Sequence, residues 1–205
     1  MYSFSRAIPL PKMSIILPSF AGIAKPSGGG GAAPPDGGSI TNQYSVSFDG
    51  TNDYMDCGGS TTFHFSDGSG NDLAFSISAW VKFDSNDRMR LVSKDTSTSS
   101  REYLFGTNAS NKCNMLLGTG SVNLNVQNNT TLNGIDWFHL VSTYDGSESA
   151  SGLKVYVNGD ASSLTDNSAG SYTGMSQTGG NFEIGGFANG HSEFDGLVDE
   201  VAVFN

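Results

Sequence analysis

The clearest indication of the fold is the segment Phe194-Asp-Gly-Leu-Val-Asp-Glu-Val-Ala-Val-Phe-Asn205. Its β-branched and aromatic side chains suit a pleated, half-buried surface and therefore predict a β-strand. Because side chains alternate between the two faces of a strand, Leu197, Val201 and Val203 are expected on one face, with Asp199 between them. A carboxylate on an apolar face is costly unless something pairs with it. The pattern predicts a strand that closes a sheet and an inward acid with a structural or a metal-binding role.

The rest of residues 44–205 repeats this kind of pattern in short pieces. Brief apolar runs alternate with clusters of glycine, asparagine, aspartate and serine, which is typical of an all-β sandwich or barrel. No stretch has apolar residues at helical spacing, and no repeat of fixed period supports a propeller or a solenoid. The expected strands are 44–49, 54–57, 73–83, 88–93, 102–105, 113–117, 121–127, 135–144, 152–157, 182–187 and 194–204. They are enough for two packed antiparallel sheets.

Residues 1–43 differ in kind from the rest of the chain. The first 24 residues are apolar and interrupted by Pro9, Pro11 and Pro18, and a run of glycine and proline follows in 25–38. Prolines prevent helix, and glycine-rich composition makes a flexible linker. We predict an irregular N-terminal docking arm and linker over 1–43, whose apolar part needs a protein partner, followed by one domain over 44–205. No apolar run reaches the ~20 residues of a transmembrane helix, so no membrane insertion is expected.

Charge is spread unevenly over a chain whose net charge is −10. Residues 1–43 hold three basic residues and one acidic residue, and 44–205 hold seven basic and nineteen acidic residues, a net −12. An acidic body repels phosphate backbones and anionic lipid, which argues against nucleic-acid binding and against binding to a membrane surface.

Two cysteines, Cys57 and Cys113, are too few for a disulfide framework. Cys57 alternates with Met55 on what the pattern indicates is the inner face of a strand. A buried free thiol is therefore favoured over a disulfide. The absence of a CxxC motif or of paired histidines excludes a zinc site of the usual kind.

The order of the segments resembles the laminin-G-like members of the concanavalin A-like lectin/glucanase superfamily, over about residues 44–205. Each piece is weak alone, and the six together in the right order are specific. The matching pieces are Tyr44-Ser-Val-Ser-Phe-Asp-Gly-Thr-Asn-Asp-Tyr-Met55, Phe75-Ser-Ile-Ser-Ala-Trp-Val-Lys82, Trp137-Phe-His-Leu-Val-Ser-Thr-Tyr-Asp-Gly146, Leu153-Lys-Val-Tyr-Val-Asn-Gly159, Phe182-Glu-Ile-Gly-Gly186 and Phe194-Asp-Gly-Leu-Val-Asp-Glu-Val201.

The resemblance implies a two-sheet antiparallel jelly roll that binds glycans or proteins, typically without catalysis. Glucanases of the superfamily carry paired glutamates around an aspartate on one strand, and this chain has no such spacing. Glu183 is alone on its strand, and the adjacent Asp199 and Glu200 point to opposite faces. Glycoside hydrolysis needs two carboxyl groups facing one substrate, so no enzymatic activity is expected.

The resemblance also implies a structural calcium ion, since the fold would bring the first and last strands together. Asp199, with Asp49 and Asn52 of the turn after the first strand, supplies oxygen ligands of the kind that calcium takes. The alternative is that Asp199 accepts hydrogen bonds as a structural residue.

Three further side chains are weighed as binding or catalytic residues. His139 has no nucleophile motif beside it and is interpreted as a satisfied core residue. Trp80 and Trp137 could stack on sugars, but core packing is favoured for both.

Three functions follow from the sequence, in order of preference. The first is a structural and adhesion module that the arm anchors to a larger assembly, most naturally a phage capsid decoration or fibre on a virion surface. The second is a secreted, extracellular carbohydrate-binding module, and the third is a glycoside hydrolase. The ligand-binding residues stay unknown, and a homo-oligomer is left open.

Overall fold

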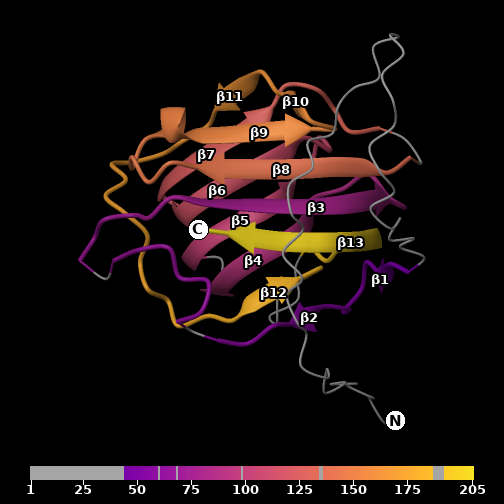
Figure 1. Cartoon of the computed structure of the whole chain (residues 1–205), viewed down its shortest axis with the longest axis horizontal. Coiled ribbons are helices and arrows are strands. Elements are labelled where there is room, and N and C mark those ends of the chain that lie inside the picture. The colour runs from indigo at the N-terminus through magenta and orange to yellow at the C-terminus, as the bar shows by residue number, and fades with distance from the viewer. Residues whose placement is uncertain (1–43, 60, 68, 98, 134–135, 187–191) are drawn as a thin grey trace, which may run out of the picture. The chain divides into compact units, whose positions relative to one another are not determined.

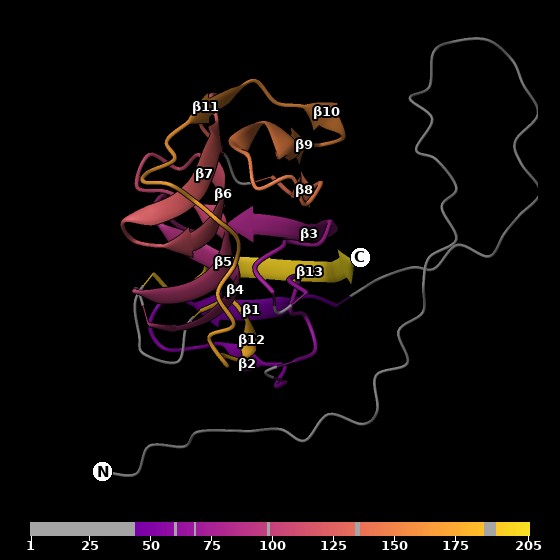
Figure 2. The same ribbon diagram turned by 90° about the vertical axis from the view of Figure 1, so that its left-hand side faces the viewer.

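A computed structural model describes residues 44–205 except 60, 68, 98, 134–135 and 187–191. The predicted docking arm and linker over 1–43 lie outside the described residues. The described part is almost entirely β-structure, folded as two antiparallel sheets that pack face to face, as predicted (Figures 1 and 2). A single turn of 3-10 helix, η1 (Ala150–Gly152), is the helical element among these residues, and none of them forms a helix that could cross a membrane.

One sheet has six strands in the order β1-β13-β3-β8-β9-β10. The predicted closing strand, β13, lies inside this sheet between β1 and β3, not at its edge. A tight turn at Asn158-Gly159, whose two φ angles are +54° and +86°, connects β9 to β10 as a hairpin. The strands are β1 (Val46–Asp49), β3 (Phe75–Phe83), β8 (Phe138–Tyr144), β9 (Leu153–Val157), β10 (Asp160–Ala161) and β13 (Asp195–Phe204).

The other sheet has seven strands in the order β11-β7-β6-β5-β4-β12-β2. Its middle is a run of sequential antiparallel strands from β4 to β7, and its two edges are short. The strands are β2 (Met55–Asp56), β4 (Met89–Ser97), β5 (Ser100–Thr107), β6 (Cys113–Thr119), β7 (Val122–Asn128), β11 (Leu164–Asp166) and β12 (Phe182–Ile184).

The hydrophobic core lies between the sheets and follows the period of two that strands impose. On β3 every second side chain is buried, whereas nearly every residue of β5 and β6 is buried, and these two strands supply core residues from the opposite sheet. Stacked and tilted aromatic pairs fill one part of this core, including Phe65 on Phe75 with ring centroids 4.2 Å apart. Core members include Ile77, Val81, Tyr103, Phe105, Met115, Leu117, Leu140 and Val155.

A β-bulge in β13 changes which residues of the closing strand face the core. Val198, opposite Val81, is 3% exposed and points inward, so Leu197 and Asp199 lie on the outer face. The register shifts between Asp199 and Ala202, where Glu200 has a φ of +48°. Beyond the bulge Val201 and Val203 pack on the core. The expectation that Asp199 shares an inward face with Leu197 is therefore wrong.

The two cysteines are both free thiols, as favoured from the sequence, but they lie in different environments. Cys113 is buried in the core. Cys57 is exposed just after β2, so the prediction of an inner-face position for it is wrong. The short β2 ends at Asp56, and the alternation assumed for Cys57 does not extend that far.

Candidate ligand-binding site

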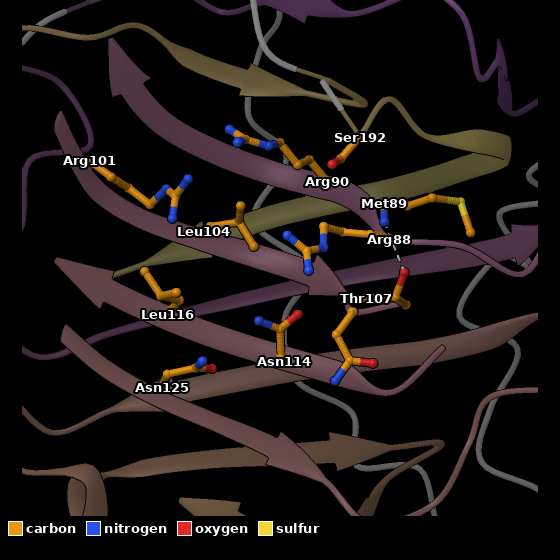
Figure 3. Close-up of a pocket in the computed structure, with 11 residues that line it drawn as sticks. Arg88, Met89, Arg90, Arg101, Leu104, Thr107, Asn114, Leu116, Asn125 and Ser192 are labelled. Carbon is orange, nitrogen blue, oxygen red and sulfur yellow. Dashed lines mark hydrogen bonds between the residues drawn. The ribbon is translucent and has the colours of Figure 1, made fainter. Parts of the chain in front are cut away.

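A pocket of about 440 Å³ lies on the outer face of the seven-stranded sheet, over β4 to β7 (Figure 3). This volume falls within the range of small-molecule sites in proteins. Its lining combines three arginines with amides and two leucines: Arg88, Met89, Arg90, Arg101, Leu104, Thr107, Asn108, Asn114, Leu116, Asn125 and Ser192.

The alternation of the central strands builds the floor of the pocket. Leu104 on β5 pairs with Leu116 on β6, and Leu116 pairs with Asn125 on β7. Their neighbours in sequence, such as Phe105 and Met115, point the other way into the core. The result is a row of three side chains across the outer face, with two apolar groups and an amide.

A bulge and a glycine shape the end of the pocket at β4. The register shifts between Arg90 and Val92, which keeps Arg90 on the outer face while Leu91 and Val92 are both buried in the core. Gly106 stands opposite Arg90, and a Cβ atom there would lie 2.1 Å from the carbonyl oxygen of Met89. Only glycine therefore allows β4 and β5 to approach this closely.

Two of the three arginines are held by one carboxylate. Asp95 Oδ2 accepts a hydrogen bond from Arg90 Nη1 at 2.6 Å and another from Arg101 Nε at 3.2 Å. The side chains of Arg90 and Arg101 are 5% and 9% exposed, and that of Asp95 is fully buried. This triad carries a formal charge of +1 and fixes both guanidinium groups against the sheet.

Burial perturbs the titration of this triad. Desolvation raises the pKa of Asp95, and the charges of the two arginines oppose that rise. Desolvation lowers the pKa of Arg101, and the nearby charge of Arg90 adds to the decrease. Asp95 opposes this decrease in the pKa of Arg101, and the charge of Arg88 adds to it by a smaller amount.

The third arginine, Arg88, is exposed and enters the pocket from the segment before β4. Figure 3 shows Arg88 and Arg101 extending over the sheet on opposite sides of Leu104. Among the described residues no salt bridge includes Arg88. Its guanidinium is therefore a donor group open to a ligand.

Two asparagines in the pocket lining each have a buried side-chain oxygen that receives no hydrogen bond from the described residues. These oxygens are Oδ1 of Asn114 and Oδ1 of Asn125. Because both oxygens are buried, neither is exposed to a ligand in the pocket as the side chains are placed, and a buried acceptor with no donor is costly.

The residues expected to bind calcium are not brought together by the structure. Asp49 pairs with Asp195 on β13, and Asp199 lies four positions further along, or about 13 Å at strand spacing. Asp49 Oδ1 accepts from Thr51 N, and Asp199 Oδ1 accepts from Glu200 N. Asn52 is exposed in the turn after β1.

Among the described residues no group of three or more acidic, histidine or cysteine side chains could hold a metal ion. Asp49 and Asp199 as placed do not fit one shared site. Calcium binding by this chain stays a prediction.

The expectations that Trp80, Trp137 and His139 pack in the core are wrong. Trp80 and His139 do not pack in the core but stack on each other on the outer face of the six-stranded sheet, with ring centroids 5.0 Å apart. Trp137 is 37% exposed just before β8. The reason is the alternation itself, since Ala79, Val81 and Leu140 occupy the inward positions beside them.

Sequence reasoning missed the arginine pocket altogether. A signal was present in the charge pattern, because four of the seven basic residues of 44–205 fall within residues 88–101: Arg88, Arg90, Lys94 and Arg101. Such a cluster in an acidic body is the kind of asymmetry that marks a binding surface. Lys94 faces inward instead, where its Nζ donates to the carbonyl oxygen of Gly180.

Comparison with solved structures finds other chains with a similar fold. A CBM40 domain of a Ruminococcus gnavus IT-sialidase, solved with α2,3 sialyllactose, has a TM-score of 0.57 and 15% identity, covering 78% of this chain and 88% of that one. A putative carbohydrate binding protein from Bacteroides ovatus has a TM-score of 0.53 and 19% identity, covering 78% and 42%.

A heptameric SAP-like pentraxin from Limulus polyphemus has a TM-score of 0.46 and 16% identity, covering 63% of each chain. This chain therefore spans less than two thirds of the pentraxin and of the Bacteroides protein. At these identities the likenesses show a shared fold.

No match to a curated protein is found. A laminin-G-like family model, described as the concanavalin A-like lectin/glucanases superfamily, matches residues 49–205. The match extends from the end of β1 to the last residue of the sequence, and it agrees with the two-sheet architecture. The chain belongs to the laminin-G-like family of the concanavalin A-like lectin/glucanases superfamily.

Proposed function

We propose that this protein is a non-enzymatic, lectin-like binding module that takes a glycan into the arginine pocket. The observation that carries the proposal is the pocket itself: about 440 Å³ on the outer face of the seven-stranded sheet, lined by cationic, amide and apolar groups. Sugars present hydroxyl groups to amides and guanidinium groups and C–H faces to apolar side chains such as Leu104 and Leu116. The likeness to the sialyllactose-bound CBM40 supports a glycan as the ligand class.

The composition of the pocket supports binding without catalysis. Its lining residues include three guanidinium groups and no carboxylate. Asp95, the acid beside it, is engaged by both Arg90 and Arg101. Glycoside hydrolysis requires a general acid and a second carboxylate on opposite sides of one bond, and this pocket offers neither.

A glycan array and calorimetry test the proposal. The full chain is probed with neutral and acidic oligosaccharides, including sialyllactose, and with two variants that place tryptophan on outer strand faces. Leu116→Trp fills the pocket, whereas Val141→Trp adds the same side chain on the outer face of the other sheet. We expect binding by the wild type and Val141→Trp and its loss in Leu116→Trp. An empty array, or binding that Leu116→Trp leaves intact, contradicts the proposal.

We also propose that residues 1–43 anchor the module to a larger assembly, such as a phage capsid decoration or fibre, at a virion or other extracellular surface. The support is compositional: an apolar, proline-interrupted segment followed by a glycine-rich linker. Deletion of residues 1–38 should abolish incorporation into the assembly while leaving glycan binding unchanged. Normal incorporation of the shortened chain would show that the anchoring proposal is wrong.

A further inference from the structure

The first strand, β1, lies at the edge of the six-stranded sheet, and among the described strands it has a neighbour on one side only. We infer that its open side pairs with β1 of a second copy of this chain, antiparallel and about a two-fold axis at Val46. The six-stranded sheets of the two copies then form one continuous sheet. No residue of β1 lines the arginine pocket, so this inference is independent of the proposed function.

Apolar side chains at this edge are exposed although they point to the core side of the sheet. Val46 pairs with Val198, which is 3% exposed and faces inward, and residues opposite each other in a sheet share a face. Val46 is nevertheless 43% exposed, and Tyr44 before it is 85% exposed. Figures 1 and 2 place β2 at the same edge, and Tyr54 beside it is also 43% exposed. An apolar, uncovered edge of this kind is a template for a further strand.

The segment is uncharged in a chain that is acidic elsewhere. No charged residue occurs in 37–48, whereas 44–205 carry a net −12. Each of the other three edge strands, β2, β10 and β11, is two or three residues long and includes an aspartate. A charged side chain on an edge strand protects it against pairing, and β1 has one only at its last residue, Asp49. Two acidic copies can therefore approach each other at this edge without direct repulsion.

The sequence of the segment is complementary to itself. Tyr44-Ser-Val-Ser-Phe48 has an aromatic residue at each end, serines at the second and fourth positions and valine at the centre. Antiparallel pairing about Val46 sets aromatic opposite aromatic, serine opposite serine and valine opposite valine. Aromatic pairs and hydroxyl pairs across strands are favourable, and a two-fold interface requires this self-complementarity. The same pairing separates the two Asp49 residues by six positions, or about 20 Å at strand spacing.

The direction of the backbone hydrogen bonds agrees with this register. The N–H of Gly50 donates to the carbonyl oxygen of Phe194 at 3.0 Å, in register with the pairing of β1 and β13. Hydrogen-bonded residues alternate along an antiparallel strand. Val46 therefore directs its N–H and C=O groups toward β13, whereas Ser45 and Ser47 direct theirs to the open edge. A two-fold axis at Val46 joins these serines as hydrogen-bonded pairs, Ser45 of one copy with Ser47 of the other.

Sedimentation equilibrium of the full chain tests the inference. We expect a dimer that dissociates on dilution. Val46→Asp places two carboxylates at the axis and should raise the dissociation constant at least about 10-fold, because like charges directly opposite each other destabilise pairing. The matched control is Val122→Asp, which changes a valine of similar exposure, 38%, at the start of β7 in the other sheet. This control should leave the dissociation constant unchanged.

Two further measurements separate lost pairing from lost folding. Ser47→Pro removes an N–H that points to the open edge and that the β1–β13 pairing does not use, so it should weaken the dimer while the far-UV circular dichroism spectrum stays that of the wild type. A mixture of Val46→Asp and Val46→Lys chains should form heterodimers, because lysine faces aspartate when the two-fold axis passes through Val46.

Each result either supports the pairing or overturns it. A full chain that is monomeric at about 100 μM overturns it, since the edge is then open or covered from within the chain. A dimer that both Val46→Asp and Ser47→Pro leave intact uses another interface and also overturns it. A mixture of the Val46 variants that stays monomeric overturns the axis at Val46. Open-ended association overturns the two-fold arrangement, because an isologous contact closes at the dimer.

Discussion

Asp72 forms hydrogen bonds to three separate segments at one end of the sandwich. Its replacement should therefore lower the free energy of unfolding strongly. Asp72 is 7% exposed and lies between Phe65 and β3. Its Oδ2 atom accepts hydrogen bonds from the hydroxyl groups of Tyr144 at 2.9 Å and Tyr172 at 2.7 Å. Its Oδ1 atom accepts from the backbone N–H of Met175 at 2.7 Å.

The size of the effect follows from these three bonds. A hydrogen bond to a charged group contributes about 1.5–3 kcal/mol, so Asp72→Ala has a simple ceiling of about 4.5–9 kcal/mol. Bonds in one network are not additive, and water can reach the partly exposed side of Tyr172, so we expect a loss of about 3–5 kcal/mol. Tyr172→Phe removes one donor and should cost about 1–2 kcal/mol.

Urea denaturation of the wild type and the variants measures these losses. Asp67→Ala is the matched control, because Asp67 in the same loop also accepts three hydrogen bonds but is fully exposed. We expect a much smaller loss for Asp67→Ala. If the two alanine variants lose the same stability, or if Asp72→Ala and Tyr172→Phe add without coupling, then burial of the network is not what stabilises this end.

Three further predictions concern the strand register, a histidine and calcium. Gly196 has a φ of +139°, and a Cβ atom there would lie 2.1 Å from the carbonyl oxygen of Lys82, so Gly196→Ala should lower the free energy of unfolding by at least about 2 kcal/mol in the same denaturation assay. The control is Gly159→Ala, where a Cβ atom would have no neighbour within 4 Å and the loss should be about 1 kcal/mol. Burial lowers the pKa of His139 below 6.5, so the neutral imidazole contributes stability above pH ~6.5, and this contribution is lost as the pH falls. The melting temperature of the wild type should therefore drop more between about pH 7 and about pH 5 than that of His139→Gln. Equal drops in the two proteins would contradict a lowered pKa for His139. Since Asp49 and Asp199 are placed apart, Asp199→Asn should leave any calcium-dependent shift of the melting temperature unchanged, and loss of the shift in that variant would restore Asp199 as a ligand.

The fold could be predicted from the sequence because its signals are local and repeat many times. Short β-branched runs between turn residues gave the strands, and Asn158-Gly159 gave a hairpin that the structure confirms. The order of six weak segments gave the family. These signals survive an error of one or two residues at any strand end, so β2 ending at Asp56 did not disturb the architecture.

The face of the sheet on which each side chain lies was harder to predict, because one inserted residue reverses the alternation that follows it. The bulge at Glu200 uses a left-handed φ at a residue type that gives no sign of it in the sequence, and the simple alternation then assigns Leu197 and Asp199 to the wrong face. The bulge after Arg90 has the same effect on the pocket, since it decides that Arg90 faces outward. A site whose lining depends on register shifts within β4 is beyond what a period of two can reveal.

The contrast between an acidic body and a cationic pocket leads to a last prediction, about which acidic glycans can enter. At physiological salt the Debye length is about 8 Å, so a single carboxylate in contact with Arg88 and Arg101 feels the pocket far more than the rest of the surface. A long polyanion must also lie along the surface outside the pocket, which repels it because residues 44–205 carry a net charge of −12. We therefore expect a terminal, singly charged sugar to bind more tightly than heparin at about 50 mM salt, with the difference narrowing at about 300 mM as the repulsion is screened. Competition titrations at the two salt concentrations measure this, and heparin that binds more tightly at low salt would show that the acidic surface does not contribute to selection.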